Sequence, residues 1–515
     1  MKKISPFITR PLISFMLACF VVLASAGCYK DKGNYNYSEL GDFYIDQTGM
    51  TTNYTVKMLT QIQIEPKVVY YGNPENLSYN WKLYPTSTSL FEANAGDNIS
   101  TDKILSKVIT ATPRSYYLEF RAIETETKRF VSFLYNLRVE STGSGIEVLY
   151  QRDGLTDFGL ITPLFMFGTA EQDEVSLDIY TSVNPDYPLT GNPVGLGNHK
   201  TTATDVIFLY TENDGVCLSP FDYSIIEHFS ARFAVPPDPP KIQAYKCPIQ
   251  RNNPERAYGW EVLVNDGILY MRSQTSATET IFGPYSFEDG YNYYAAPFPL
   301  VSNGGGVVMF DMISTRLLTA GVSGSVLAVP RNDLGDPLNK DLVYMDGLPL
   351  DRINMILKDK TTDNQNNRYY YIADVFSNYT YLHKWDISAY TGIAQAELFA
   401  FSYRANTGYY VANNTIYLIK YDMIGNAIQD QAIEMWQATA GETITAILLC
   451  PHPGRDLGGN DARDRYLFVG TYNESTKDGK VYTFEVNLET DGTFIQTPVA
   501  VYGGFGKIKG FSFKF

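Results

Sequence analysis

From residue 146 to residue 515 the sequence is a series of short strand-like runs separated by turn residues, with hardly any helical period. The chain contains 40 tyrosines and 29 phenylalanines, which suit pleated, half-buried surfaces, and its 40 glycines and 26 prolines punctuate turns. About 370 residues of this kind are too many for one β-sandwich. They suit a β-propeller, whose four-stranded blades take about 40–50 residues each and whose closure removes most exposed edges. We therefore expect an all-β chain with a β-propeller-like domain of seven or eight blades over residues 146–515; two or three tandem sandwiches are the alternative.

Several runs in this region read as strands, and hairpin turns such as Asn265-Asp266-Gly267 and Asp478-Gly479 join some of them. The expected strands are 146–150, 206–210, 260–264, 267–272, 307–310, 369–375, 380–387, 415–421, 466–472, 480–486 and 508–515. The best helical candidate is the segment 426–438, whose pattern is ambiguous. The proline-rich stretch 236–240 cannot lie inside a central strand, so we expect an exposed loop there.

A second, smaller domain precedes this region. The clearest strand in residues 46–141 is the run 77–84, which places Trp81 on its apolar face. Two further runs, 116–123 and 129–139, have the pattern of a hairpin. About 95 residues with a tryptophan on an alternating strand predict an N-terminal immunoglobulin/PKD-like β-sandwich, with Trp81 in its core and not on a ligand platform.

The first 27 residues have the layout of a secretory signal that ends at a cysteine. Basic residues come first, an apolar core follows at 11–22, and small residues at 24–27 precede Cys28. This order predicts a lipoprotein signal peptide over residues 1–27 and acylation of the Cys28 thiol, which would hold the mature chain at a membrane. A transmembrane anchor and an ordinary cleaved signal are the alternatives, although the apolar run is short for a span of about 20 residues.

Two polar segments flank the expected sandwich. Residues 28–45 read as a lipidated tether, because they are polar and show no apolar period before Phe43. The small residues at 141–145 read as a linker to the propeller-like domain.

The chain is strongly acidic, with a formal net charge of −15. Removal of the signal would also remove Lys2, Lys3 and Arg10 and would bring the charge to −18. Such a chain repels phosphate backbones, so we expect no nucleic-acid partner, and the lipid would have to supply the membrane attachment.

Three cysteines follow Cys28, and their spacing is not that of a metal site or a disulfide framework. A bridge between Cys217 and Cys247 and a set of buried free thiols that includes Cys450 are both open.

No motif in the sequence predicts catalysis, a metal or a cofactor. The histidines His199, His228, His383 and His452 are scattered, and no nucleophile elbow of the G-x-S-x-G type occurs. The acidic segment 456–464 lacks the spacing of a calcium loop, so we expect a solvated loop there. A pair of carboxylates for glycoside hydrolysis remains possible among the 56 acidic residues, but the sequence favours no particular pair.

Aromatic side chains are the remaining candidates for ligand contact, because exposed rings bind sugars and peptides with little entropy loss. The densest aromatic loop supplies Tyr291, Tyr293 and Tyr294 as candidate ligand-binding residues, and packing of alternate rings into the core is the competing interpretation. The remaining tryptophans are expected to pack the blades: Trp260, Trp385 and Trp436.

Four segments together carry a family resemblance. They are Cys28-Tyr29-Lys30-Asp31-Lys32-Gly33-Asn34-Tyr35-Asn36-Tyr37, Tyr79-Asn80-Trp81, Gly145-Ile146-Glu147-Val148-Leu149-Tyr150 and Gly503-Gly504-Phe505-Gly506-Lys507-Ile508-Lys509-Gly510. In these segments the mature chain resembles the PKD-like family of surface lipoproteins from Bacteroidota. The resemblance implies an outer-membrane lipoprotein, often produced beside a SusC/SusD-type nutrient transporter, and it brings no catalytic motif.

Together these observations predict a lipid-anchored outer-membrane protein, facing the cell exterior, that binds or docks for a SusC/SusD-type uptake system without catalysing a reaction. Its ligand would be a polysaccharide, a peptide or the transporter itself. The alternatives are a surface hydrolase or lyase with carboxylates in the propeller funnel, and a purely structural subunit of the transporter complex.

Overall fold

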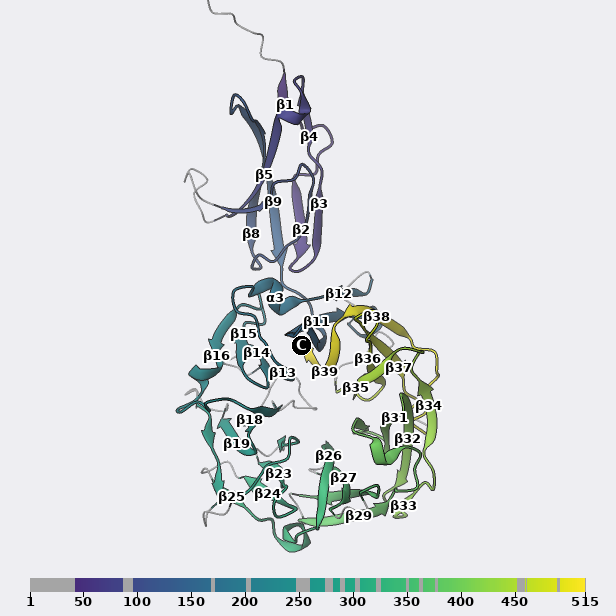
Figure 1. The fold of residues 1–515 in the computed structure, drawn as a ribbon. Coiled ribbons are helices and arrows are strands. Elements are labelled where there is room, and N and C mark those ends of the chain that lie inside the picture. Colours follow the sequence, from purple (N-terminus) through teal and green to yellow (C-terminus); the bar gives the residue numbers. More distant parts are fainter. Residues whose placement is uncertain are drawn as a thin grey trace, which may run out of the picture.

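The computed structural model describes residues 42–86, 96–167, 172–200, 205–246, 260–273, 281–287, 292–301, 306–320, 326–348, 352–360, 365–375, 378–451, 459, 461–488 and 491–514. The chain folds as a β-sandwich followed by a β-propeller (Figure 1). Helices in these residues are single turns: η1 (Pro74–Asn76), α2 (Leu164–Phe167), α3 (Ile179–Val183), η2 (Phe229–Arg232), η3 (Asn332–Gly335) and η6 (Ile393–Gln395).

The sandwich is built around one five-stranded sheet of order β2-β9-β8-β5-β6, in which β2 and β9 are parallel. Its strands are β2 (Asn53–Lys57), β9 (Phe130–Glu140), β8 (Ser115–Glu124), β5 (Leu77–Pro85) and β6 (Asp97–Ser100). Two small sheets complete it: β1 (Phe43–Asp46) with β4 (Lys67–Tyr70), and β3 (Gln61–Ile64) with β7 (Leu105–Val108). The predicted strand and hairpin are confirmed as β5, β8 and β9. Strand β1 begins at Phe43, inside the segment expected to be a tether.

Trp81 occupies the centre of the sandwich, as the sequence predicted. It is fully buried, its ring centroid lies 4.8 Å from that of Phe120 and 5.9 Å from that of Tyr135, and its indole Nε1 donates to the carbonyl of Asp102 at 2.9 Å. The buried ring therefore has both the aromatic contacts and the hydrogen-bond partner that a core tryptophan requires.

The propeller has seven sheets among the described residues, which agrees with the lower of the two expected blade numbers. The strands of each blade are given below in the order of their hydrogen-bonded neighbours, and in blades 1, 2, 5 and 7 the first of them lies nearest the centre of the ring (Figure 1). Blade 1 contains β39 (Lys507–Lys514), β10 (Gly145–Arg152), β11 (Leu155–Thr162) and β12 (Glu174–Ser176). Blade 2 contains β13 (Pro193–Lys200), β14 (Asp205–Thr211), β15 (Gly215–Leu218) and β16 (Ile225–His228). Blade 3 contains β17 (Ile242–Lys246), β18 (Trp260–Asn265), β19 (Ile268–Ser273) and β20 (Gly283–Pro284).

The remaining blades repeat this order. Blade 4 contains β22 (Leu300–Val301), β23 (Val307–Asp311), β24 (Arg316–Ala320) and β25 (Val326–Ala328), with β21 (Ser286–Phe287) beside β25. Blade 5 contains β26 (Lys340–Leu348), β27 (Arg352–Asp359), β28 (Arg368–Asp374) and β29 (Thr380–Asp386). Blade 6 contains β30 (Phe399–Phe401), β31 (Thr407–Ala412), β32 (Thr415–Asp422) and β34 (Ile433–Gln437), with β33 (Ala427–Ile428) also pairing with β32. Blade 7 contains β35 (Thr443–Leu449), β36 (Tyr466–Asn473), β37 (Asp478–Glu485) and β38 (Ala500–Phe505).

The C-terminal strand closes the ring. β39 pairs antiparallel with β10, the first strand after the linker, so the two ends of the propeller sequence share one blade. Closure of this kind joins the first and last strands of the propeller in one sheet and leaves only short, protected edges.

A β-bulge recurs in the innermost strands. In blades 1, 2, 3, 5 and 7 the innermost strand carries one residue more than its partner strand at one point of the ladder. The extra residues are Val194, Gln243, Val343, Thr445 and Lys509. A bulge bends its strand and changes the direction of a side chain, and three of these residues, Val194, Gln243 and Lys509, line the central cavity described below.

The sandwich is packed onto blade 1. Lys57 at the end of β2 forms an ion pair with Glu174 of β12 at 2.7 Å, and buried apolar side chains of the sandwich and of blades 1 and 2 belong to one cluster. The expected linker is also held, because Thr142 Oγ1 lies 2.6 Å from the hydroxyl of Tyr223 and accepts from Lys514 Nζ at 2.7 Å. The junction is therefore a packed contact between the two parts (Figure 1).

The local structure departs from the expected one at the segment predicted to be a helix. The segment 426–438 is not a helix, because it forms the strands β33 and β34, and Met435 and Trp436 pack into the apolar core of blades 6 and 7. The other expected strands all form, and the proline-rich stretch 236–240 is a surface loop as predicted.

Cys217 is a free thiol buried in blade 2, and burial raises its pKa to about 12. It is therefore an unreactive packing residue. Cys450 is also free and buried, whereas Cys247 lies outside the described residues.

Candidate functional site

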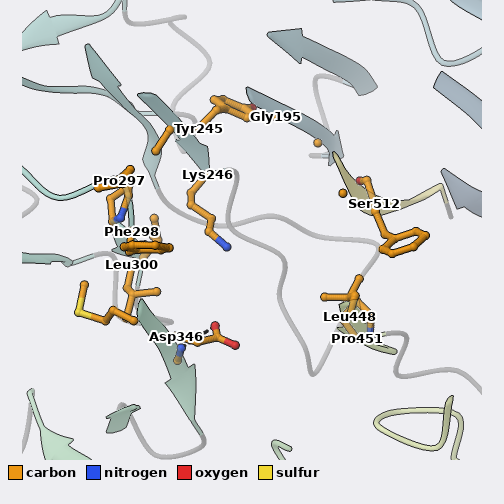
Figure 2. Close-up of a pocket in the computed structure, with 18 of the residues that line it drawn as sticks. Gly195, Tyr245, Lys246, Pro297, Phe298, Leu300, Asp346, Leu448, Pro451 and Ser512 are labelled. Carbon is orange, nitrogen blue, oxygen red and sulfur yellow. Dashed lines mark hydrogen bonds between the residues drawn. The ribbon is translucent and has the colours of Figure 1, made fainter. Parts of the chain in front are cut away.

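A cavity of about 550 Å³ lies at the centre of the propeller, where the innermost strands of several blades meet (Figure 2). This volume is within the range of about 300–1,000 Å³ that is typical of small-molecule sites. All seven blades contribute strand or loop residues to its wall. The cavity is thus a product of ring closure, since its walls come from segments more than 300 residues apart.

One part of the wall is apolar. In Figure 2, Phe298 and Leu300 of blade 4 lie on one side of the cavity, and Leu448 and Pro451 of blade 7 lie on the opposite side. The Phe298 ring is half-buried and is fixed by an edge-on contact with Tyr344, with centroids 5.5 Å apart. These groups offer a ligand apolar faces on two sides.

Cations outnumber carboxylates in the described lining. The lining contains three cations, Lys246 at the end of β17, Arg352 at the start of β27 and Lys509 on β39, and a single acid, Asp346 of β26. None of the three cations takes part in an ion pair in the described part of the chain. In a protein of net charge −15 this local excess of positive charge sets the cavity apart.

Lys246 and Asp346 both project into the cavity (Figure 2). The carboxylate of Asp346 is held by its own strand: it accepts from the backbone N–H of Gly347 at 2.7 Å and from the Tyr344 hydroxyl at 3.3 Å. Lys246 is exposed and has no such restraint, so its ammonium group is available to a ligand.

The bulges described above explain why polar groups face the centre at some of these positions. Lys509 is the extra residue of β39, and Gln243 is the extra residue of β17; both line the cavity. The irregular pairing changes the direction of both side chains, which strand alternation alone would not have predicted. The Gln243 amide donates to the Tyr294 hydroxyl and accepts from the N–H of Gly267.

Two glycines leave open space in the wall. A Cβ atom built on Gly347 or on Gly510 would meet no heavy atom within 4 Å, and both residues line the cavity. Larger side chains at these positions would therefore extend into the cavity without displacing the strands.

Of the tyrosines expected to contact ligand, the two that the structure describes lie outside the cavity lining. Tyr293 is buried in blade 3, where its hydroxyl donates to the carbonyl of Tyr285 at 2.6 Å and accepts from the N–H of Leu269 at 3.0 Å. These contacts make Tyr293 a packing residue and argue against the ligand role. Tyr294 is 39% exposed and accepts from Gln243 Nε2 at 2.7 Å, but it is not in the cavity lining. Tyr291 lies outside the described residues, so its role stays a prediction.

Two of the other tryptophans follow the packing interpretation. Trp385 and Trp436 are buried in the cores of blades 5 to 7, and β18 begins at Trp260. His199 is fully buried, and burial lowers its pKa to about 4. Within the described ranges no three His, Cys, Asp or Glu side chains are grouped as metal ligands would be. The proposed lipid site, Cys28, lies outside the described residues.

The residues that line the cavity were not identified from the sequence. Lys246, Arg352 and Lys509 are single basic residues at strand ends or in a bulge, spread over more than 260 positions. The available signal was weak: each is a basic residue beside an apolar run in an acidic chain.

One buried charge network lies between blades 2 and 3. Arg232 donates to both carboxylate oxygens of Glu261, at 2.8 and 2.6 Å, and Arg272 lies 3.2 Å from the same carboxylate. Arg232 also donates to the hydroxyl of Tyr210. All these groups pair with one another, so the network stabilises the contact between the two blades and is not a candidate site.

Among the described residues, none of the helices has the length and apolar character needed to cross a membrane.

The PKD-like family model matches residues 28–193. This part comprises the sandwich and strands β10, β11 and β12 of blade 1, so the PKD-like resemblance is supported there, over about a third of the chain. A search of curated proteins found no match.

Among solved structures, the chain is similar to a quinonprotein alcohol dehydrogenase-like protein from Bacteroides thetaiotaomicron, with 13% identity, a TM-score of 0.45 and coverage of 92% of this chain and 99% of that one. It is also similar to the dihydro-heme d1 dehydrogenase NirN (10% identity, TM-score 0.38, coverage 88% and 79%) and to Hsv2 of Kluyveromyces lactis (7% identity, TM-score 0.40, coverage 70% and 99%). These likenesses are too remote to carry an argument about function, and the propeller is defined by the strand pairing of the chain itself.

Proposed function

We propose that this chain is a lipid-anchored protein of the bacterial outer membrane that binds ligand, without catalysis, for a SusC/SusD-type nutrient-uptake system. The observation that supports a binding role is the central cavity, which combines apolar walls with a few charged groups, as small-molecule sites do. The sandwich would act as a spacer between the lipid at Cys28 and the propeller. Anchoring beside the transporter would raise the local concentration of captured ligand without new contacts.

The charges of the cavity support binding over two-carboxylate hydrolysis. A glycosidase of that type needs two acidic groups that flank the scissile bond. The described lining supplies Asp346 alone, and its carboxylate is already engaged by Gly347 and Tyr344. A hydrolase or lyase would therefore need a second carboxylate from another source.

The test is affinity capture of the tagged full-length protein from native outer membranes in mild detergent, with mass spectrometry of the proteins recovered. We expect stoichiometric recovery of a SusC/SusD-type pair. A Cys28→Ala variant should lose membrane association and, with it, most of this recovery. Recovery of the wild-type protein without partners would overturn the uptake role, and turnover of a polymer that Asp346→Asn abolishes would establish catalysis in its place.

A further inference from the structure

The cationic side chains of the central cavity indicate the charge of its ligand. Lys246, Arg352 and Lys509 come from blades 3, 5 and 1, so three separate blades each place one cation on the same cavity. Cationic side chains at a protein surface are commonly paired with acids, and this chain has 56 acidic residues against 41 basic ones. Three cations without an ion pair at one cavity are therefore a local departure from the charge of the molecule.

Each cation is differently restrained. Arg352 is half-buried, and its guanidinium Nη1 lies 3.9 Å from the sulfur of Met423, a weak acceptor that leaves most of its donors free. Lys246 and Lys509 are exposed, and Lys509 is held in the bulge of β39. A planar guanidinium and two exposed ammonium groups together suit a carboxylate, which Arg can bind through two parallel hydrogen bonds.

The single acid of the lining limits what this ligand can be. Asp346 projects into the cavity with Lys246, but its two oxygens accept from Gly347 and Tyr344, so its charge is partly satisfied by its own strand. The Asp346 carboxylate would disfavour a ligand that carries negative charge on every side. A ligand with one anionic end, and with hydroxyl or amide donors toward Asp346, meets both sets of groups.

The apolar part of the wall indicates the size and apolar character of the rest of the ligand. Phe298 and Leu300 face Leu448 and Pro451 across the cavity (Figure 2). A compact ring or short chain with an apolar face fits between such walls, and a volume of about 550 Å³ accommodates a molecule of drug-like size but not a long polymer segment.

We propose that the central cavity binds a small carboxylate-bearing ligand, with the carboxylate on Lys246, Arg352 and Lys509 and its apolar face against Phe298 and Leu448. This inference rests on the proposed binding role and adds to it the charge class of the ligand. An acidic monosaccharide unit and a short acidic peptide share this chemistry, and the experiment separates them.

The experiment is calorimetric titration of the full mature chain in detergent with four probes: galacturonate, galactose as its neutral counterpart, the dipeptide Ala-Glu with an amidated C-terminus, and Ala-Gln with an amidated C-terminus as the counterpart without a carboxylate. We expect one acid to bind about tenfold or more tightly than its neutral counterpart, because a hydrogen bond to a charged group contributes about 1.5–3 kcal/mol and 1.4 kcal/mol corresponds to a factor of ten. Preference for galacturonate would identify an acidic sugar, and preference for Ala-Glu would identify an acidic peptide.

Three variants place the binding in the cavity. Lys246→Gln should weaken binding of the acidic probe about tenfold and leave binding of the neutral probe unchanged. Gly510→Phe should block binding of both probes, because the phenylalanine side chain would enter open space in the cavity. Lys107→Gln, on the exposed face of β7 in the sandwich, is the matched control and should change nothing. Circular dichroism of each variant confirms folding, and Gly347→Phe repeats the blocking test at a second position.

The outcomes separate this inference from the proposed function. Equal affinity for acidic and neutral probes, or binding of the acid that neither Lys246→Gln nor Gly510→Phe reduces, would overturn the inference while recovery of the transporter pair still stood. Conversely, tight binding of an acidic probe in the cavity together with capture of no transporter would uphold the inference and remove the uptake role.

Discussion

The sandwich and the propeller use charge in different ways. The sandwich has an apolar core centred on Trp81, and ion pairs within it, such as Arg121 with Glu119, lie at least partly in solvent. The propeller buries charges in its interior, at Glu147 and Lys514 in blade 1 and at the Arg232–Glu261–Arg272 network between blades 2 and 3. Stability of the sandwich therefore depends mainly on packing, whereas the arrangement of the blades depends also on matched buried charges.

The contrast has a physical reason. A sandwich forms largely from neighbouring hairpins, and apolar burial alone can specify it. A ring of similar blades needs contacts that distinguish one neighbour from another, and an unmatched buried charge strongly disfavours wrong packing. Removal of a core group from each region, followed by removal of a surface pair, tests this comparison.

The largest expected effect is in the sandwich core. Trp81→Ala should lower the free energy of unfolding of the sandwich by about 3–5 kcal/mol, because it removes a large buried ring and leaves a cavity. Chemical denaturation followed by circular dichroism measures this loss. Tyr71→Ala, at a side chain of the same region that is 72% exposed, is the control and should change stability little. A loss as small as that of the control would show that packing around Trp81 does not dominate the sandwich.

A somewhat smaller loss is expected from the propeller network. Glu261→Gln should lower the free energy of unfolding by about 3 kcal/mol, because it removes the buried countercharge of Arg272 and leaves Arg232 with the partly exposed Glu227, whose carboxylate lies 3.5 Å from Arg232 Nε. The matched control is Glu434→Gln, at an exposed position of β34. Denaturation curves of the two variants should differ clearly; curves that coincide would show that the buried network does not stabilise the blade contact.

The next effect concerns pH. Burial raises the pKa of Glu147 from its ordinary 4.5 to about 7, so the folded chain holds this proton more tightly than the unfolded chain does. The resulting stability is fully present below about pH 4.5 and is lost as the pH rises through about 7. Glu147→Gln cannot titrate, so its stability should fall less than that of the wild-type chain over this range.

Thermal unfolding midpoints of both proteins between pH 4 and 8 measure the difference. Burial lowers the pKa of the neighbouring Lys514 to about 8, so its contribution is present above about pH 10.5 and is lost as the pH falls through about 8. The two profiles are therefore compared between pH 4 and 7. Parallel pH profiles for the variant and the wild-type chain would mean that Glu147 does not titrate within this range.

The smallest effect is expected at the junction. Lys57 and Glu174 are each about one third exposed, so their ion pair is screened by solvent and should contribute at most about 1 kcal/mol. A double-mutant cycle with Lys57→Gln and Glu174→Gln isolates this energy. A coupling well above 1 kcal/mol would mean that the two regions are joined by electrostatics and not mainly by their shared apolar cluster.

The comparison also explains which parts of the structure the sequence could predict. The run 77–84 alternates apolar and polar residues, and this local pattern was enough to predict β5 and to place Trp81 in the core. The segment 426–438 shows the limit of local pattern: it forms two short strands because Met435 and Trp436 find apolar partners in the core of blades 6 and 7, which the sequence does not display. Tyr293 shows the same limit, because its contacts with Tyr285 and Leu269, and not the local aromatic pattern, place it in the core.

The sequence alone determined that the chain would be nearly all β, with a small sandwich before a propeller of seven or eight blades, because strand alternation, turn residues and segment length are local properties. Only the tertiary structure decided the blade number, the closing pair of β10 and β39, and the site. Lys246, Arg352 and Lys509 meet at one cavity because ring closure brings distant strands to a common centre and a bulge turns Lys509 toward it. No local pattern records such a meeting, since it depends on contacts between residues that are far apart in the chain.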